Sequence, residues 1–248
     1  MADPAPAARP GETPLLALEG VSKRFGGLTA VSDLHLVVHH GELRCLIGPN
    51  GAGKSTVFKL IMGFERPSSG RIMFDGSGID SWPTWRRARQ GLSIKMQIPG
   101  IYPELSVHDN MRVAAQYHVQ RGQMEESIER LLARVGLAGM SGELAKNLSH
   151  GQQQWLEIGM ALSVNPKLLL LDEPTAGMGP GETEATARIV ESLNADGVTI
   201  MVIEHDMTFV RQIARKVTVM NLGRLFAEGT ITEIEANQDV MDIYLGRT

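Results

Sequence analysis

The chain of 248 residues has a mass of 27.0 kDa, the size of one or two domains. Apolar residues make up 43% of it and charged residues 21%, which is typical of a globular core and excludes disordered and fibrous proteins. The 24 basic and 28 acidic residues leave a net charge of −4, which argues against a nucleic-acid-binding surface, so we expect no nucleic-acid partner. The single cysteine, Cys45, excludes an internal disulfide, and no apolar run reaches the ~20 residues of a membrane-spanning helix.

Residues 1–14 are rich in proline and alanine and lack the apolar segment of an export signal. We therefore predict a disordered tail, followed by one domain over 15–248. Short strands dominate the start of this domain, and one of them runs into a glycine-rich turn and a helix that stops at Gly63. The elements predicted here are strands at 15–21, 34–38, 42–47 and 71–74 and a helix at 54–62.

The middle of the chain favours helices and the last third alternates strands with helices. Four apolar residues between 128 and 135 follow the i, i+3, i+4, i+7 spacing of a half-buried helix. Continuous apolar strands separated by helices are typical of a parallel sheet covered on both faces. We therefore predict an α/β fold with a mostly helical insertion at about 97–154. The elements predicted here are helices at 123–135, 152–163 and 182–193 and strands at 167–171 and 198–203.

Residues 48–55 match the pattern G-x-x-x-x-G-K-[S/T] and lie between a predicted strand and a predicted helix. In such a loop the backbone N–H groups and the helix N-terminus face phosphate oxygens. Lys54 is expected to reach the β- and γ-phosphates and the Ser55 hydroxyl to bind Mg²⁺. The alternative, a glycine-rich turn with an exposed lysine, is disfavoured by this context. The residues predicted to bind nucleotide here are Gly48, Pro49, Asn50, Gly51, Ala52, Gly53, Lys54, Ser55 and Thr56.

Two adjacent carboxylates, Asp172 and Glu173, follow the apolar strand at 167–171. Asp172 at the strand end is placed to hold Mg²⁺, and Glu173 to polarise the water that attacks the γ-phosphate. Two acids after a strand also occur in a simple solvated turn. Their combination with the phosphate loop favours nucleotide hydrolysis.

The segment LSHGQ at 148–152 resembles the LSGGQ signature of ABC transporter ATPase subunits, and the likeness runs from Leu15 to the end of the chain. In that family the signature serves the ATP held by a second subunit. The resemblance therefore implies that Ser149, Gly151 and Gln152 bind the γ-phosphate of a partner's nucleotide. Ser149 is also a good N-cap for the helix that follows, so a plain helix cap is the alternative. His150 stands where the family has a glycine.

The resemblance also assigns roles to three further side chains. Phe25 matches the aromatic residue that stacks on adenine, its alternative role being to pack on the core at the end of a strand. Gln97 matches the glutamine that bridges Mg²⁺ or the attacking water to the membrane-facing subdomain, which makes it both a catalytic residue and a metal ligand. His205 matches the histidine that hydrogen-bonds the γ-phosphate, its alternative role being structural. Gly179 stands where the family has an aspartate that makes contacts across the dimer.

For the whole chain, the resemblance implies a P-loop ATPase core with a mostly parallel sheet, an antiparallel β subdomain and a helical signature subdomain. Its cofactors would be ATP and Mg²⁺. Its partners would be membrane-spanning permease subunits, a second ABC ATPase subunit (identical or related) and, indirectly, an extracytoplasmic solute-binding protein. The expected location is the cytoplasmic face of the inner membrane, where the apolar residues at 98–102 would receive the permease.

The overall pattern most resembles the ATPases of importers for urea or short amides and for branched-chain amino acids. The signature, the residues WLEIGM at 155–160, the AGM loop at 176–178 and the ending YLGR at 244–247 favour the urea type. A branched-chain amino acid importer is the alternative. A soluble ABC ATPase that moves no solute is a further alternative, but such proteins usually carry two cassettes or a long coiled coil. A catalytically idle cassette is disfavoured by Lys54, Glu173 and His205.

Overall fold

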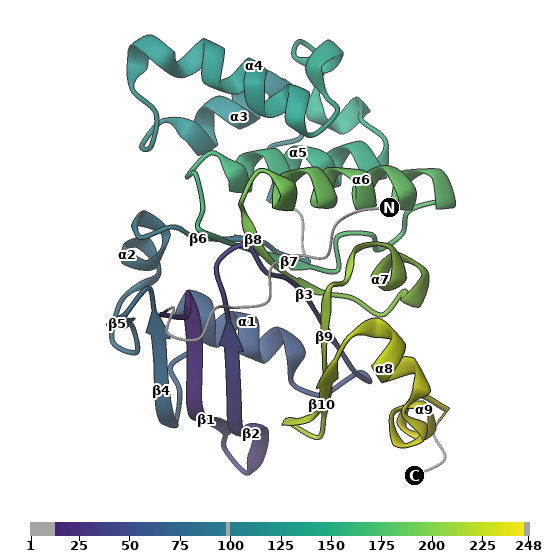
Figure 1. The fold of residues 1–248 in the computed structure, drawn as a ribbon. Coiled ribbons are helices and arrows are strands. Elements are labelled where there is room, and N and C mark those ends of the chain that lie inside the picture. The colour runs from purple at the N-terminus through teal and green to yellow at the C-terminus, as the bar shows by residue number, and fades with distance from the viewer. Residues whose placement is uncertain (1–12, 98–99, 246–248) are drawn as a thin grey trace.

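A computed structural model describes residues 13–97 and 100–245 of the chain (Figure 1). Most of the predicted tail, two residues of the apolar loop at 98–102 and the last two residues of the YLGR ending lie outside the described part. The strands are β1 (Leu16–Phe25), β2 (Leu28–Val38), β3 (Leu43–Ile47), β4 (Ser69–Phe74), β5 (Ser77–Gly78), β6 (Leu92–Lys95), β7 (Leu168–Asp172), β8 (Thr199–Ile203), β9 (Lys216–Asn221) and β10 (Arg224–Gly229). The helices are α1 (Lys54–Met62), α2 (Thr84–Arg89), α3 (Val107–Ala115), α4 (Met124–Arg134), α5 (His150–Leu162), α6 (Pro180–Ala195), α7 (Met207–Ile213), α8 (Ile231–Ala236) and α9 (Gln238–Leu245).

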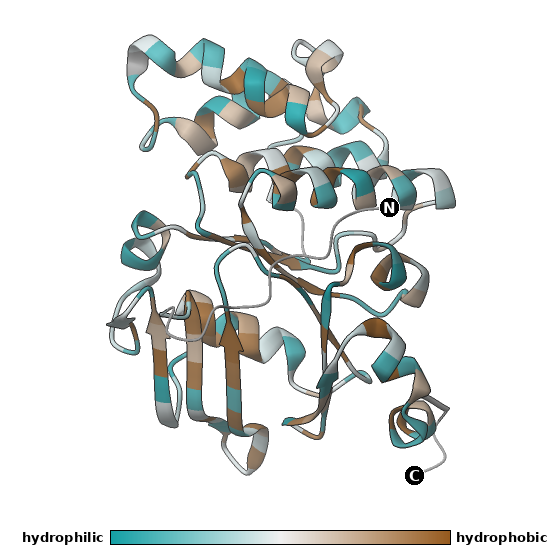
Figure 2. Cartoon of the chain, viewed as in Figure 1, coloured by the Kyte–Doolittle hydropathy of each residue, from teal (hydrophilic) through white to brown (hydrophobic). Residues whose placement is uncertain are grey.

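The larger sheet has six strands in the order β10-β9-β3-β8-β7-β6 and is parallel from β9 to β6, with β10 antiparallel at the edge. Strands β3, β7 and β8 are buried along their whole length, and hydrophobic residues concentrate along the central strands in Figure 2. Parallel strands need such two-sided burial because their connections place helices on the sheet faces. The predicted α/β class with a mostly parallel sheet is confirmed.

Alternating side chains of β7 show how the sheet separates two cores. Leu168 and Leu170 belong to the core that contains α1 and the smaller sheet, whereas Leu169 and Leu171 belong to the core that contains α3 to α7. Successive residues of a strand point to opposite faces, so a continuous leucine run fills both cores at once. The carboxyl ends of β3, β7 and β8 then meet at one edge of the sheet.

The two smaller parts of the fold flank this sheet. A four-stranded antiparallel sheet has the order β2-β1-β4-β5. Helices α3 and α4 pack with α5 at the top of Figure 1, away from the antiparallel sheet. The buried residues Ile128, Leu131 and Leu132 lie on one face of α4, which the apolar spacing predicted. Helix α5 begins inside the predicted insertion and continues beyond it to Leu162.

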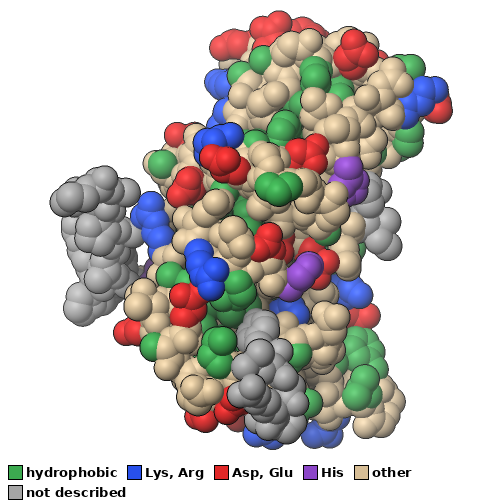
Figure 3. Space-filling view, turned by 90° about the vertical axis from the view of Figure 1, so that its right-hand side faces the viewer, with side chains coloured by type: hydrophobic (Ala, Val, Ile, Leu, Met, Phe, Trp, Pro, Cys, Tyr) green, Lys and Arg blue, Asp and Glu red, His purple; other side chains and the backbone are tan. Residues whose placement is uncertain are grey.

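The surface gives no sign of a membrane span in the part that is described. Among the helices of residues 13–97 and 100–245, none has both the length and the hydropathy to cross a bilayer. Acidic and basic side chains are interspersed on the face seen in Figure 3, and the hydrophobic ones form small separate groups.

Candidate nucleotide site

The phosphate loop joins β3 to α1 and fits tightly between two neighbouring segments. Gly48 has φ = 147° and Gly53, the N-cap of α1, has φ = 98°. A Cβ atom on Gly48 would lie 2.2 Å from the Met220 carbonyl oxygen, and one on Gly53 would lie 2.4 Å from the Ala30 carbonyl oxygen. Only glycine combines these backbone angles with so close an approach. The two fixed glycines thus shape a loop that opens onto the N-terminus of α1.

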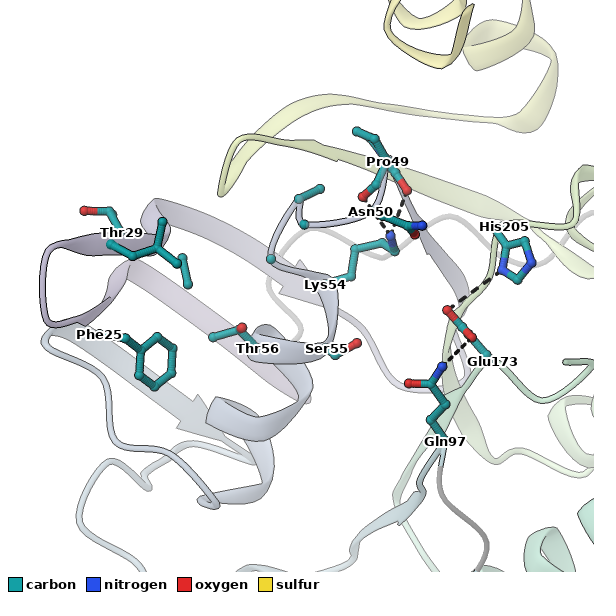
Figure 4. Close-up of a pocket in the computed structure, with 16 residues that line it drawn as sticks. Phe25, Thr29, Pro49, Asn50, Lys54, Ser55, Thr56, Gln97, Glu173 and His205 are labelled. Atoms are coloured by element: carbon teal, nitrogen blue, oxygen red, sulfur yellow. Dashed lines mark hydrogen bonds and ion pairs between the residues drawn. The ribbon is translucent and has the colours of Figure 1, made fainter. Parts of the chain in front are cut away.

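Lys54 lies at the mouth of this loop. Its Nζ donates hydrogen bonds to the carbonyl oxygens of Gly48 at 2.7 Å and Pro49 at 3.1 Å (Figure 4). Burial lowers the pKa of Lys54, and the charges of Glu173 and Asp172 oppose that shift. The side chain therefore presents a cation over the glycine backbone, where a phosphate would bind.

Asp172 ends β7 beside the first residues of α1. It accepts a hydrogen bond from Ser55; burial raises its pKa, the charge of Glu173 adds to that shift, and the Ser55 hydrogen bond opposes it. Its Oδ1 is buried and makes no hydrogen bond to any residue that the structure describes. A buried carboxylate oxygen that lacks a donor, next to a hydroxyl, fits a hard divalent cation such as Mg²⁺.

Glu173 faces the pocket with Gln97 and His205. Gln97 Nε2 donates to Glu173 Oε2 at 2.9 Å, and His205 Nδ1 lies 3.8 Å from Glu173 Oε1 (Figure 4). The backbone of Glu173 is left-handed, with φ = 48°, which is costly for a residue with a side chain. Strain of this kind at a carboxylate that faces a pocket is typical of a catalytic position.

A pocket of about 890 Å³ lies among these groups. All nine predicted loop residues line it, as do Phe25, Gln97, Glu173 and His205, whereas the predicted metal ligand Asp172 is not part of its lining. The Phe25 ring is 41% exposed, and the Lys23 ammonium lies 4.6 Å from its centroid. The half-exposed ring is therefore available to stack on a base at the far end of the pocket from Glu173 (Figure 4).

The predicted signature residues lie elsewhere, at the N-terminus of α5. Ser149 is its N-cap and forms a capping box with Gln152, whose side chain accepts from the Ser149 amide at 2.9 Å. His150 Nε2 lies 2.9 Å from the Ala176 carbonyl oxygen, on the loop that leads to Gly179. The structure thus brings the segments with the two departures from the family pattern into contact. Within the described part of the chain, the lining of the pocket does not include Ser149, Gly151 or Gln152.

Comparison with known proteins agrees with this geometry. The family model described as "ABC transporter" matches residues 31–176, more than half of the chain. The chain belongs to the ABC transporter family. As an ABC ATPase it binds ATP, and it is similar to subunits that hydrolyse ATP for transport.

Individual ABC relatives cover nearly the whole chain. The high-affinity branched-chain amino acid transport ATP-binding protein LivG of Escherichia coli (strain K12) is 36% identical over 94% of this chain and 98% of its own length. The lipopolysaccharide export system ATP-binding protein LptB of the same strain is 33% identical over 93% and 97%. The crystal structure of the ADP conformation of the ABC cassette MJ1267 superposes with a TM-score of 0.88 at 29% identity, over 95% of this chain and all of that one.

Two buried residues next to the site, Glu204 and Lys95, were not predicted from the sequence. The Glu204 carboxylate accepts hydrogen bonds from the amides of Thr175 and His205 at 3.1 and 3.0 Å, and it ties together the loops after β7 and β8. Lys95 Nζ lies 3.4 Å from the carbonyl oxygens of both Asp172 and Glu173. Glu204 and Lys95 each stand at the end of an apolar strand, and the sequence offers no other indication of their roles. Neither residue belongs to a contiguous motif.

Proposed function

We propose that the chain is the ATP-hydrolysing subunit of an importer for a small polar solute, and that it works as a pair of ABC subunits. The observation that carries the proposal is the arrangement of Gln97, Glu173 and His205 across one pocket from Lys54. Within that pocket the chain holds the phosphates and polarises a water molecule. The signature lies outside that pocket, where it would serve the nucleotide of a second chain.

In the proposed mechanism each side chain has a separate task. Lys54 and the loop amides bind the β- and γ-phosphates, while Phe25 stacks on adenine. Glu173 accepts a hydrogen bond from the attacking water and increases its nucleophilicity. His205 donates to the γ-phosphate as charge moves onto the leaving oxygen.

The donor set at Ser55, Asp172 and Gln97 consists of oxygen ligands suited to Mg²⁺. When bound there, Mg²⁺ neutralises charge on the β- and γ-phosphates. Ser55 and Asp172 are held in place by their mutual hydrogen bond, and Gln97 by its bond to Glu173. Removal of either hydrogen bond would leave a ligand free to turn away from the cation.

The pairing step depends on the signature of the other subunit. Ser149 and the amide of Gly151 at the N-terminus of α5 would meet the γ-phosphate that the partner's loop holds. Hydrolysis removes that bridge, so the pair opens, because a ligand shifts an equilibrium only through contacts that differ between the two states. ATP turnover per chain should therefore rise with protein concentration in purified samples. Brisk turnover at dilutions where only single chains exist would overturn the pairing.

The opening of the pair would reach a permease through the residues after Gln97. Tyr102 is 50% exposed there, and residues 98 and 99 lie outside the described part of the chain. We place the subunit at the cytoplasmic face of the inner membrane, with an extracytoplasmic solute-binding protein acting through the permease. Co-purification with membrane-spanning subunits distinguishes this role from that of a soluble ABC ATPase.

For the solute we propose urea or a short amide, on the basis of the LSHGQ, WLEIGM and AGM segments. The 36% identity to LivG favours a branched-chain amino acid as the second candidate. LptB is almost as similar and is named for export, so identity at this level does not decide the solute.

Uptake of labelled urea, acetamide and leucine by cells that lack this gene tests the choice. Complementation with the intact gene should restore urea or acetamide uptake, and the Glu173→Gln variant should not. If complementation restored leucine uptake alone, the solute would be a branched-chain amino acid and not urea or a short amide.

A further inference from the structure

In the single chain, a carboxylate contacts the signature segment at residues 148–152. Glu182 lies in the first turn of α6, and its Oε1 accepts a hydrogen bond from Ser149 Oγ at 2.8 Å. The Gly151 amide also faces this carboxylate and helps to lower its pKa. A Cβ atom on Gly151 would lie 2.6 Å from both Cδ and Oε1 of Glu182, so the carboxylate is in close contact with the N-terminus of α5.

This carboxylate uses the donors that a γ-phosphate would need. The Ser149 hydroxyl has one proton, and a deprotonated phosphate oxygen can only accept it. The positive end of the α5 dipole also favours one anion, and a second anion beside it would be repelled. The Ser149 hydrogen bond lowers the pKa of Glu182, so the side chain is charged at neutral pH.

We propose that Glu182 is an internal anion that occupies the signature in the single chain and that the γ-phosphate of a second subunit must displace. Glu182 is thus a positioning residue that acts through Ser149. It raises the ATP concentration needed for pairing, and it favours ATP over ADP because only ATP brings a γ-phosphate to compete. The proposal rests on the ATP-bridged pair proposed above.

The competing explanation is that Glu182 merely caps α6. Its Oε2 accepts from the Gly179 amide at 3.4 Å, in the geometry of a capping box. Glu182→Gln separates the two roles, because the amide oxygen still accepts a hydrogen bond at the cap but has no charge. Glu184→Gln is the matched control, since Glu184 lies on the same helix, pairs with Arg188 at 2.8 Å and is 61% exposed.

The first experiment measures ATP-driven dimerisation by sedimentation velocity, with Glu173→Gln in every sample so that ATP persists. A charge-assisted hydrogen bond exceeds a neutral one by roughly 1 kcal/mol, so Glu182→Gln should lower the ATP concentration for half-dimerisation about fivefold. ADP should induce no dimer in either protein. A Glu182→Gln midpoint equal to that of the Glu184→Gln control, or higher, would overturn the proposal.

The second experiment needs no pairing. In dilute single chains, added inorganic phosphate should shift the Gly151 amide resonance in Glu182→Gln and leave it in place in the Glu184→Gln control. An unmoved resonance in both proteins overturns the role of Glu182. A shift in Glu182→Gln, in a protein that never dimerises with ATP, would support the internal anion and refute the bridged pair instead.

Discussion

Replacement of Glu173 tests the site most directly, because activity and stability should respond in opposite ways. Glutamine keeps the size of the side chain and an acceptor for the Gln97 hydrogen bond, but it is too weak a base to polarise water. General-base assistance is worth roughly 10²–10⁴ in rate, which corresponds to about 3–5 kcal/mol of barrier. Glu173→Gln should therefore lose that factor in single-turnover hydrolysis and keep its affinity for ATP.

Stability depends instead on the backbone. A left-handed conformation such as the φ of 48° at Glu173 costs a residue with a side chain of order 1–3 kcal/mol, and glutamine would pay the same cost. Glu173→Gly removes it, and it also removes the charge that adds to the effect of burial in raising the pKa of Asp172. The loss of the exposed Gln97 hydrogen bond and the greater freedom of glycine in the unfolded chain offset part of this gain. We expect a net gain of about 1 kcal/mol, or roughly 2–4 °C in Tm for a chain of this size.

Calorimetry without nucleotide, together with the single-turnover assay, measures both effects on the same three proteins. The parent and Glu173→Gln should unfold at similar temperatures, and Glu173→Gly at a higher one while hydrolysing least. If Glu173→Gly melted no higher than Glu173→Gln, strain would not be stored at this residue. If Glu173→Gln retained a third of the parent rate, another group would have to polarise the water.

Substitutions at three further positions probe separate parts of the structure. Lys54→Ala should lower ATP affinity at least tenfold, and normal binding by calorimetric titration would contradict the phosphate loop. Phe25→Ala should weaken ATP binding about 3–10-fold, because it removes one aromatic stacking contact, whereas Phe25→Trp should bind ATP as well as the parent does. If Phe25→Ala bound ATP as tightly as the parent, the Phe25 ring would not stack on adenine. Arg87 is fully buried and donates to the carbonyl oxygens of Leu60 and Ile61 at 2.7 and 2.8 Å. Arg87→Met should therefore lower the free energy of unfolding in urea by about 3 kcal/mol or more, because the buried carbonyl oxygens of Leu60 and Ile61 each lose a hydrogen-bond donor. A loss below about 1 kcal/mol would show that water replaces the guanidinium.

The sequence predicted those strands of the parallel sheet that are buried on both faces, because burial there requires apolar side chains. Strands β3, β7 and β8 are covered on both faces, so they appear as mostly apolar runs, with Arg44 as an exception in β3. Strand β9 was not predicted, and its Thr218 hydroxyl accepts a hydrogen bond from the buried Arg44 at 2.9 Å. Arg44 also pairs with Glu42 at 2.6 Å and with Glu228 on β10. A buried ion network looks like surface sequence, and only its partners show that it lies inside.

The residues of the site likewise fall into those that the sequence predicted and those that it did not. Lys54, Ser55, Asp172 and Glu173 belong to short contiguous motifs whose local geometry is set by the strand, turn and helix around them, and the structure gathers these residues. Glu204 acts on two loops that are about 30 residues apart in the sequence, so nothing near it reveals its role.

The signature shows why local motifs were not enough. His150 and Gly179 each depart from the family pattern, and each could be noted from the sequence without any relation between them. In the fold the His150 ring lies on the Ala176 carbonyl oxygen, and the Gly179 amide donates to the carboxylate that holds Ser149. His150, which stands where the family has a glycine, therefore contacts the loop whose Gly179 amide donates to the Glu182 carboxylate. In the proposed pair, a change at any of these positions would therefore act first on the signature of its own chain, through Ser149, and only then on contacts with a partner.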